Sequence, residues 1–123
     1  GLLAGVKYVR QRGMQNILDR ERRLALLAAE GMRTIDGVRV FALSGLRDQA
    51  GVLSFAPEYK DVEEIGSGLA EKGIAVRSGL HCAPFAHRSA GTLDTGTVRL
   101  SFSDFNTPVE VYRFLSVLQG VLR

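Results

Sequence analysis

The segment Thr97 to Phe102 alternates cleanly between polar and apolar residues, and this alternation constrains the fold more than any other feature. Successive side chains of a strand point to opposite faces of a sheet. One face of this strand therefore suits a hydrophobic core, and we expect helices to cover it and to leave the polar face open. The apolar face carries Val98, Leu100 and Phe102, and the polar face carries Thr97, Arg99 and Ser101.

The other elements follow from periodicity and from end signals. The last helix has Thr107 at its cap, Pro108 in its first turn and Glu110 three residues after the cap. Asp61 and Glu64 form a similar capping-box pattern. In chain order we expect a helix up to Gly13, a helix from Met14 to about Gly31, strands over 38–43 and 52–55, a helix after Asp61, a strand over 74–77, a short helix over 84–90, the strand 97–102 and a helix from Thr107.

These elements predict an α+β fold, with a small, mostly antiparallel sheet and helices packed mainly on one face. The 123 residues fit a single domain. Because the chain begins at Gly1 within a helical pattern and without Met, we expect it to be part of a longer protein. Losing a neighbouring domain exposes apolar surface, so we expect the isolated chain to self-associate through the first helix or the open face of the sheet.

Composition limits the cellular location and the binding partners that we expect for this chain. No apolar run approaches the roughly 18 residues of a membrane helix, so we expect no membrane association. The single cysteine permits no internal disulfide, which favours a cytoplasmic protein. Five arginines fall between Arg10 and Arg23. They lack interleaved aromatic residues and fit the solvent face of a helix, so we expect no nucleic-acid partner.

The segment from Arg77 to Pro84 contains the single cysteine, Cys82, directly after His81. Cationic neighbours lower the pKa of a thiol, and the thiolate is the nucleophile. The alternative is a small, inert buried cysteine. We expect no metal site, because His81, Cys82 and His87 give only three candidate ligands where a structural zinc needs four. A cysteine hydrolase would require a third orienting group that the sequence does not identify.

Arg99 is the second candidate functional residue. The planar guanidinium of an arginine can bind a carboxylate through two hydrogen bonds, and a position in mid-strand on the polar face would present it to a ligand. The alternative is a solvent-exposed arginine without a ligand. For Arg77 the alternative is a surface ion pair, which would contribute little to stability.

Two motifs together resemble a known family. Ile74-Ala-Val-Arg-Ser-Gly-Leu-His-Cys-Ala-Pro84, followed by Thr97-Val-Arg-Leu-Ser-Phe102 and Phe105-Asn-Thr107, is similar to the C-terminal small domain of class V aminotransferase-fold enzymes, of PLP fold type I. Within them the resemblance is to the cysteine desulfurase and selenocysteine lyase branch. It extends over essentially the whole chain, so residues 1–123 would be the small domain and a large domain would lie outside this chain.

The resemblance implies a chemistry for the candidate residues. In this family pyridoxal 5'-phosphate (PLP) is the electron sink for the substrate amino acid. Cys82 matches the nucleophile that takes sulfur from L-cysteine, leaving a persulfide and alanine. Arg99 matches the arginine that binds the substrate carboxylate, and Arg77 matches a second active-site arginine. His81 precedes the nucleophile, with a role open between acid–base catalysis and packing.

The resemblance also implies binding partners and a large domain that lies outside this chain. We expect a homodimer and a protein that accepts the sulfur. None of the three lysines, Lys7, Lys60 and Lys72, lies in the family's Ser-x-His-Lys context. We therefore expect the large domain to supply the cofactor lysine and this chain alone to be inactive.

Two departures leave the substrate open among cysteine, selenocysteine, a sulfinate and a related amino acid. Leu80 replaces a histidine of the best-known desulfurases, and the loop from Ser89 to Thr97 is unusual for them. Two alternatives also remain open. One is an aminotransferase, epimerase or β-lyase in which Cys82 is incidental. The other is a non-enzymatic assembly module.

Overall fold

The computed structural model describes residues 1–42 and 48–123. Within these residues the chain forms five helices and one sheet of four antiparallel strands in the order β1-β2-β4-β3. The expected strand over 38–43 ends at Phe41, and its last residue lies outside the described part. The elements are α1 (Leu2–Arg12), α2 (Met14–Arg33), β1 (Val38–Phe41), β2 (Val52–Pro57), α3 (Val62–Glu71), β3 (Arg77–Gly79), α4 (Pro84–Ala90), β4 (Thr97–Ser101) and α5 (Pro108–Leu122).

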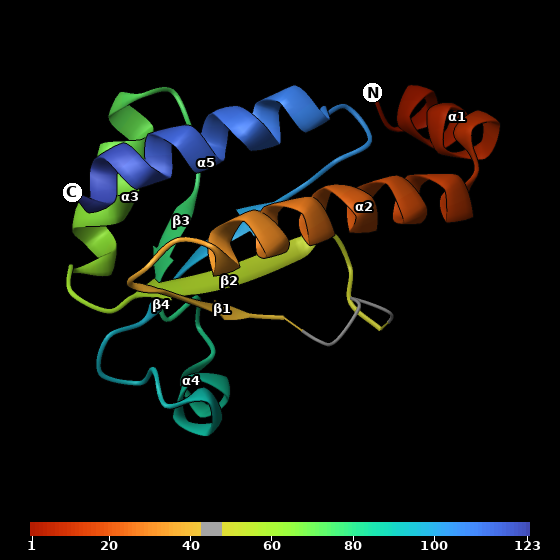
Figure 1. The fold of residues 1–123 in the computed structure, drawn as a ribbon. Coiled ribbons are helices and arrows are strands. Elements are labelled where there is room, and N and C mark those ends of the chain that lie inside the picture. Colours follow the sequence, from red (N-terminus) through yellow and green to blue (C-terminus); the bar gives the residue numbers. More distant parts are fainter. Residues whose placement is uncertain (43–47) are drawn as a thin grey trace.

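The helices α2, α3 and α5 lie on one side of the sheet, and the short helix α4 lies on the other (Figure 1). The predicted fold class is therefore confirmed: the chain is α+β, with helices mainly on one face. The covered face and the three helices enclose the hydrophobic core. Its fully or nearly fully buried side chains include Met32, Leu53, Phe55, Ile65, Leu69, Val98, Leu100, Val111, Phe114 and Leu118.

The opposite side, which we call the open face, carries a row of residues across all four strands. Phe41 pairs with Ser54, Ser54 with Arg99, and Arg99 with Arg77. Cross-strand partners point to the same face of an antiparallel sheet. Ser78, next to Arg77, points to the helix side, where its hydroxyl donates a hydrogen bond to Glu63 at 2.7 Å. Arg77 and Arg99 therefore both belong to the open face.

The strand predicted over residues 74–77 is displaced, because β3 begins only at Arg77. The Ile74 amide donates to the Leu69 carbonyl at 2.9 Å, which ties this segment to the end of α3. The side chains of Ile74 and Val76 pack against the core. A cavity of about 390 Å³ lies between residues 73–75 and the end of β4. Hydrogen-bonded pairing between β3 and β4 therefore begins only at Arg77, opposite Arg99.

Two of the predicted helix ends differ in detail. The capping box of α5 is confirmed, with Thr107 and Glu110 bonding each other's backbone amides. At α3 the Asp61 carboxylate accepts from the Glu63 amide, while Glu64 lies 3.6 Å from the Lys60 ammonium instead. The helix α2 ends at Arg33, between Gly31 and the Asp36-Gly37 turn that were expected to end this helical region.

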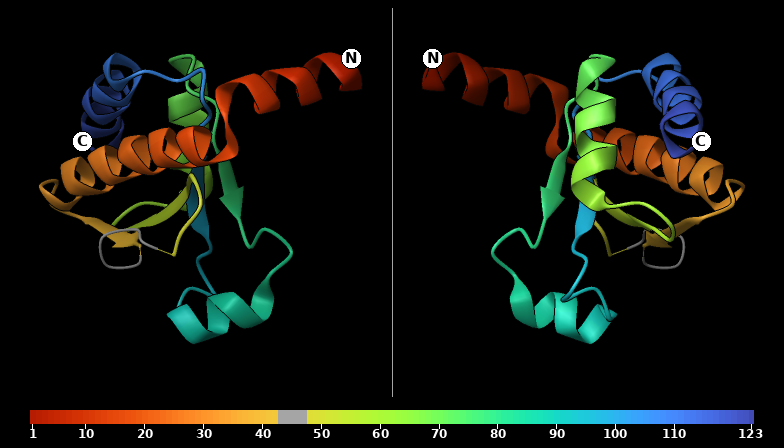
Figure 2. Two further views of the ribbon diagram at one scale, coloured as in Figure 1. Left: turned by 90° about the vertical axis from the view of Figure 1, so that its right-hand side faces the viewer. Right: turned by 90° about the vertical axis from the view of Figure 1, so that its left-hand side faces the viewer.

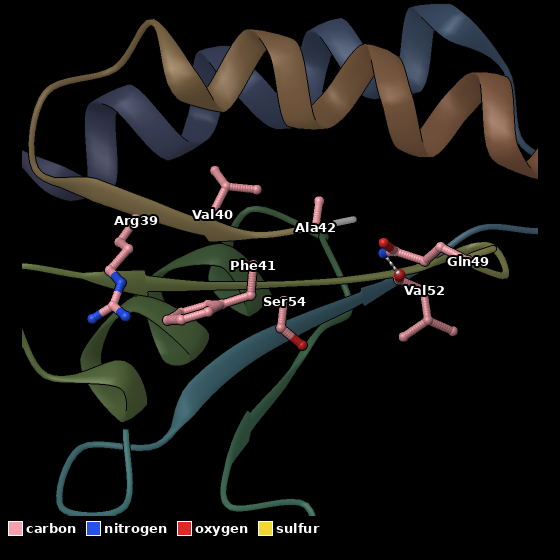
Figure 3. A pocket seen from close by; sticks show the side chains of 7 residues that line it. All are labelled: Arg39, Val40, Phe41, Ala42, Gln49, Val52 and Ser54. Atoms are coloured by element: carbon pink, nitrogen blue, oxygen red, sulfur yellow. Dashed lines mark hydrogen bonds between the residues drawn. The ribbon is translucent and has the colours of Figure 1, made fainter. Parts of the chain in front are cut away.

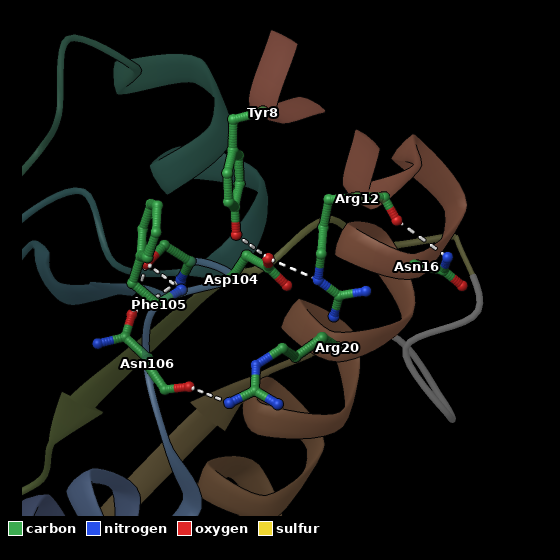
Figure 4. A network of polar contacts seen from close by, with 8 residues as sticks. Tyr8, Arg12, Asn16, Arg20, Asp104, Phe105 and Asn106 are labelled. Carbon is green, nitrogen blue, oxygen red and sulfur yellow. Dashed lines mark hydrogen bonds and ion pairs between the residues drawn. The ribbon is translucent and has the colours of Figure 1, made fainter. Parts of the chain in front are cut away.

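The first helix projects from the body of the molecule (Figure 2). Gly13, at φ 85°, separates it from α2, and none of its residues is buried. A polar cluster holds it: Tyr8 and Arg12 both donate to the Asp104 carboxylate, directly before Phe105, on which the Tyr8 ring stacks (Figure 4). We call Tyr8, Arg12 and Asp104 the α1 clamp.

In the part of the chain that the structure describes, no helix combines the length and apolar character needed to cross a bilayer.

Candidate functional site

The candidate site lies between the open face and α4. A hollow of about 300 Å³ opens there, and we call it the α4 hollow. It gathers residues from β1, β2, β4, α4 and the turn after β3. Its lining residues are Phe41, Ser54, His81, Ala83, Ala86, His87, Ala90, Thr92, Thr97 and Arg99.

Two of the predicted site residues, Arg99 and His81, line this hollow together. Arg77 lies beside them as the cross-strand partner of Arg99, with its side chain exposed. Like charges directly opposite each other destabilise a sheet. The two positive charges create a surface suited to an anion such as a carboxylate, which an arginine can bind through two hydrogen bonds. A bound anion would offset the repulsion between them.

Cys82 is exposed at the surface and is not among the residues that line the hollow. Its neighbours in the chain, His81 and Ala83, both line it. His81 and Cys82 have φ angles of 54° and 59°, so two consecutive non-glycine residues occupy the left-handed region. This conformation is uncommon and costs free energy, and such strain concentrates at functional sites.

The turn that holds Cys82 is fixed by contacts with the start of β4. Gly79 pairs with Thr97. Gly96 lies so close to Gly79 that a Cβ atom on Gly96 would stand 2.8 Å from the Gly79 carbonyl oxygen, and its φ is 73°. The His81 Nε2 atom lies 3.2 Å from the Thr97 carbonyl oxygen. These contacts place the turn beside the strand that carries Arg99.

The contact with Thr97 also determines the tautomer of His81. A carbonyl oxygen only accepts, so Nε2 carries the hydrogen and donates, and Nδ1 remains an acceptor when the ring is neutral. Burial lowers the pKa of His81, and the positive charge of Arg99 lowers it further. The neutral ring is therefore favoured at neutral pH, on the residue that directly precedes Cys82 in the chain.

His87 is a residue of this site for which the sequence indicated only a candidate metal ligand. It is 7% exposed, and its Nδ1 atom lies 2.7 Å from the Thr92 hydroxyl. Its ring centre is 6.0 Å from that of His81. Among the described residues no group of three or more His, Cys, Asp or Glu side chains is arranged to hold a metal ion.

A second, shallow hollow of about 600 Å³ lies next to the first on the open face and shares Phe41 and Ser54 with it. Figure 3 shows the Arg39, Phe41 and Ser54 side chains pointing away from the two helices above the sheet, α2 and α5. The Arg39 guanidinium lies over the Phe41 ring, 4.7 Å from its centre, and donates to the Ala90 carbonyl at 3.0 Å. The sequence did not indicate Arg39, which joins β1 to the end of α4.

The lysines of this chain do not fit the attachment of PLP. Lys60 donates to the carbonyl groups of Val121 and Arg123, Lys7 lies on α1, and Lys72 ends α3. None of them lines the hollow that contains Arg99. The described residues thus provide a thiol, an imidazole and two guanidinium groups, but no amine to hold the cofactor.

The chain is similar to known proteins over nearly all of its length. The model of the family "Aminotransferase class-V" matches residues 1–114. The chain is 37% identical over all of its length to "Probable cysteine desulfurase 2" of Mycobacterium leprae and 36% identical to "Probable cysteine desulfurase" of Pyrococcus abyssi, and it covers 28% and 30% of those proteins.

Solved structures give the same result. The chain superposes on the apo cysteine desulfurase of Thermococcus onnurineus with a TM-score of 0.89 at 32% identity, covering 97% of this chain and 29% of that one. For the cysteine desulfurase CsdA of Escherichia coli the TM-score is 0.86 at 27% identity, with coverages of 97% and 28%. The chain thus spans less than a third of the length of these relatives.

Proposed function

The chain belongs to the class V aminotransferase family, and from this premise we propose that it is the C-terminal small domain of a PLP-dependent cysteine desulfurase. In this proposal the whole enzyme takes sulfur from L-cysteine and produces alanine and a persulfide on Cys82. The large domain supplies the lysine that this chain lacks, so the chain alone is inactive. When bound there, PLP supplies the electron sink for the substrate carbon skeleton.

The observation that carries the proposal is the position of Cys82. It lies on a strained, exposed turn whose base is bonded to the strand of Arg99. A substrate whose carboxylate binds the guanidinium of Arg99 therefore lies beside the turn that carries Cys82. Arg77 adds a second positive charge beside it.

The reaction at Cys82 is a displacement at sulfur. The Cys82 thiolate forms an S–S bond with the sulfur of the substrate, and the substrate carbon–sulfur bond breaks. The electrons of that bond remain on the carbon, which takes a proton and leaves as alanine. We assign to the neutral His81 the acceptance, at Nδ1, of the proton that Cys82 loses.

The remaining parts of the proposal follow from the kind of enzyme. The relatives named above are cysteine desulfurases, which supports an amino-acid substrate, with cysteine ahead of selenocysteine or a sulfinate. A persulfide on an exposed residue suits transfer to an acceptor protein. We propose in addition a homodimer in the cytoplasm.

The test uses the full-length enzyme with Cys82→Ser. The substitution keeps the size of the side chain and removes the thiolate. We expect alanine formation from cysteine to fall by about a thousandfold or more, the scale of removing a nucleophile. The absorbance of bound PLP should be unchanged. Alanine formation at the wild-type rate would overturn the assignment of Cys82, and formation of a keto acid would show an aminotransferase instead.

A further inference from the structure

The α4 hollow contains a second imidazole that the reaction described above does not use. His87 is almost fully buried, in a hollow whose lining is mixed and includes the apolar side chains of Phe41, Ala86 and Ala90. A buried polar ring needs hydrogen-bond partners, and here the Thr92 hydroxyl bonds Nδ1 at 2.7 Å. Thr92 is itself buried, at 3% exposed. The ring is therefore held in a defined orientation.

We propose that His87 is a positioning residue for His81: its ring, anchored by Thr92, covers the His81 ring and keeps it in the neutral form that accepts a proton from Cys82. The proposal rests on the function proposed above. It assigns no contact between His87 and the substrate.

The geometry supports this role in two steps. The ring centres of His81 and His87 are 6.0 Å apart with an angle of 34° between their planes, so the His87 ring is a direct neighbour of the His81 ring. Burial is the largest cause of the low pKa of His81. The side chain of His81 is held on its other side by the bond from Nε2 to the Thr97 carbonyl.

The charged and titratable groups around His81 act in the same direction. Arg99 on β4 and Arg77 on β3 both lower the pKa of His81, and His87 on α4 adds to their effect. The Thr97 carbonyl opposes them because it accepts from the ring. His87 is the neighbour that a substitution can remove while Arg99, which binds substrate in our proposal, stays intact.

Three substitutions in the full-length enzyme separate the functions of the ring. His87→Asn retains a hydrogen-bonding group in place of Nδ1 for the Thr92 hydroxyl but removes the ring beside His81. His87→Phe retains the cover but loses that bond. Thr92→Val leaves the His87 ring in place without its anchor. Ser89→Ala, on the exposed side of the same helix, is the matched control.

We expect His87→Asn to lower kcat for alanine formation about tenfold, a fraction of the contribution of an acid–base group, and to change KM by less than about twofold. The acidic limb of the pH profile should move to higher pH. The pKa of His81, followed by NMR with carbon-13-labelled histidine, should rise. Thr92→Val and His87→Phe, which both lose the His87–Thr92 bond, should shift both in the same direction by less, and Ser89→Ala should resemble the wild type.

An unchanged pH profile and an unchanged pKa of His81 in His87→Asn would overturn the proposal. Equal losses of activity in the Asn and Phe variants, without a shift of the profile, would do the same and would indicate a purely structural role. The NMR measurement does not depend on sulfur chemistry. It therefore tests the role of His87 separately from the function that Cys82→Ser tests.

Discussion

Arg77 and Arg99 face each other across the β3–β4 pair and direct two guanidinium groups to the same side of the sheet. Neither takes part in an ion pair among the residues that the structure describes. Two like charges in this position lower stability, and an anion bound between them would offset that loss. An amino-acid carboxylate is the anion that the proposed reaction brings to this surface.

The first prediction concerns Arg99→Lys in the full-length enzyme. A lysine keeps the charge but cannot form the planar pair of hydrogen bonds. Hydrogen bonds to charged groups contribute about 1.5–3 kcal/mol, so kcat/KM for cysteine should fall about 10- to 100-fold. Steady-state assay of alanine measures this. Arg33→Lys, at the exposed end of α2, should have no effect, and an equally small effect at Arg99 would remove it from the substrate site.

The second prediction is a dependence of stability on pH that arises from His81. Burial and the charge of Arg99 hold its pKa below the ordinary value of 6.5. Between its pKa in the folded chain and 6.5, the unfolded chain binds more protons, so the free energy of unfolding falls as the pH is lowered through that interval. Above pH 6.5 His81 is neutral in both the folded and the unfolded chain, and its contribution to the free energy of unfolding is fully present.

Urea denaturation of the wild type and of His81→Gln at pH 7.5 and at pH 5.5 measures this contribution. Carboxylates also change the stability over this range, so the relevant quantity is the difference between the two proteins. The wild type should lose more free energy of unfolding on acidification than the variant. Parallel losses in both would show that His81 is not shielded.

The third prediction concerns the α1 clamp. The Asp104 side chain is 5% exposed, and the Tyr8 hydroxyl, with help from Arg12, holds the pKa of its carboxyl below the ordinary value. Asp104→Asn removes the charge to which both donors bond. Hydrogen exchange of the α1 amides should become several-fold faster, whereas exchange in α5 should not change. Asp94→Asn, in the exposed loop after α4, is the control; equal exchange in α1 for both variants would contradict a role for the clamp.

Much of the fold was predictable because its signals are local. The alternation in β4 and the capping box at Thr107 depend on residues close in sequence, and both appear as expected. The position of β3 was not predictable in this way. Ile74 and Val76 have the composition of a strand, but the bond from Ile74 to the end of α3 and the packing on the core keep them out of the ladder.

For the candidate site, too, only the features that depend on local sequence patterns could be predicted. The sequence indicated the open face around Arg99, because that follows from strand alternation. The left-handed conformation of His81 and Cys82 was not readable, since neither residue type signals it as a glycine would. The partnership of His87 with Thr92 and the bond from Arg39 to Ala90 depend on how α4 folds back under the sheet, which no local pattern specifies.

The fourth prediction concerns the apolar side of α1. Leu2 is 86% exposed and Leu3 67%, and Val6 and Val9 continue the stripe. Leu2, Gly5, Val6 and Val9 also line a hollow of about 420 Å³. Each square ångström of apolar surface removed from water stabilises an association by about 25 cal/mol. We therefore expect the isolated 123-residue chain to form dimers or larger assemblies as its concentration rises, as measured by sedimentation velocity.

Three substitutions locate the surface that is responsible. Val6→Gln interrupts the stripe and should move association to higher concentration, while Lys7→Gln, on the same helix, should leave it unchanged. Val52→Gln tests the open face, where Val52 is 41% exposed. If only Val52→Gln weakens the assembly, the open face rather than α1 mediates it. A wild-type chain that remains monomeric at every concentration would contradict association through either surface. Burial of the exposed apolar stripe would then release too little free energy to drive dimer formation.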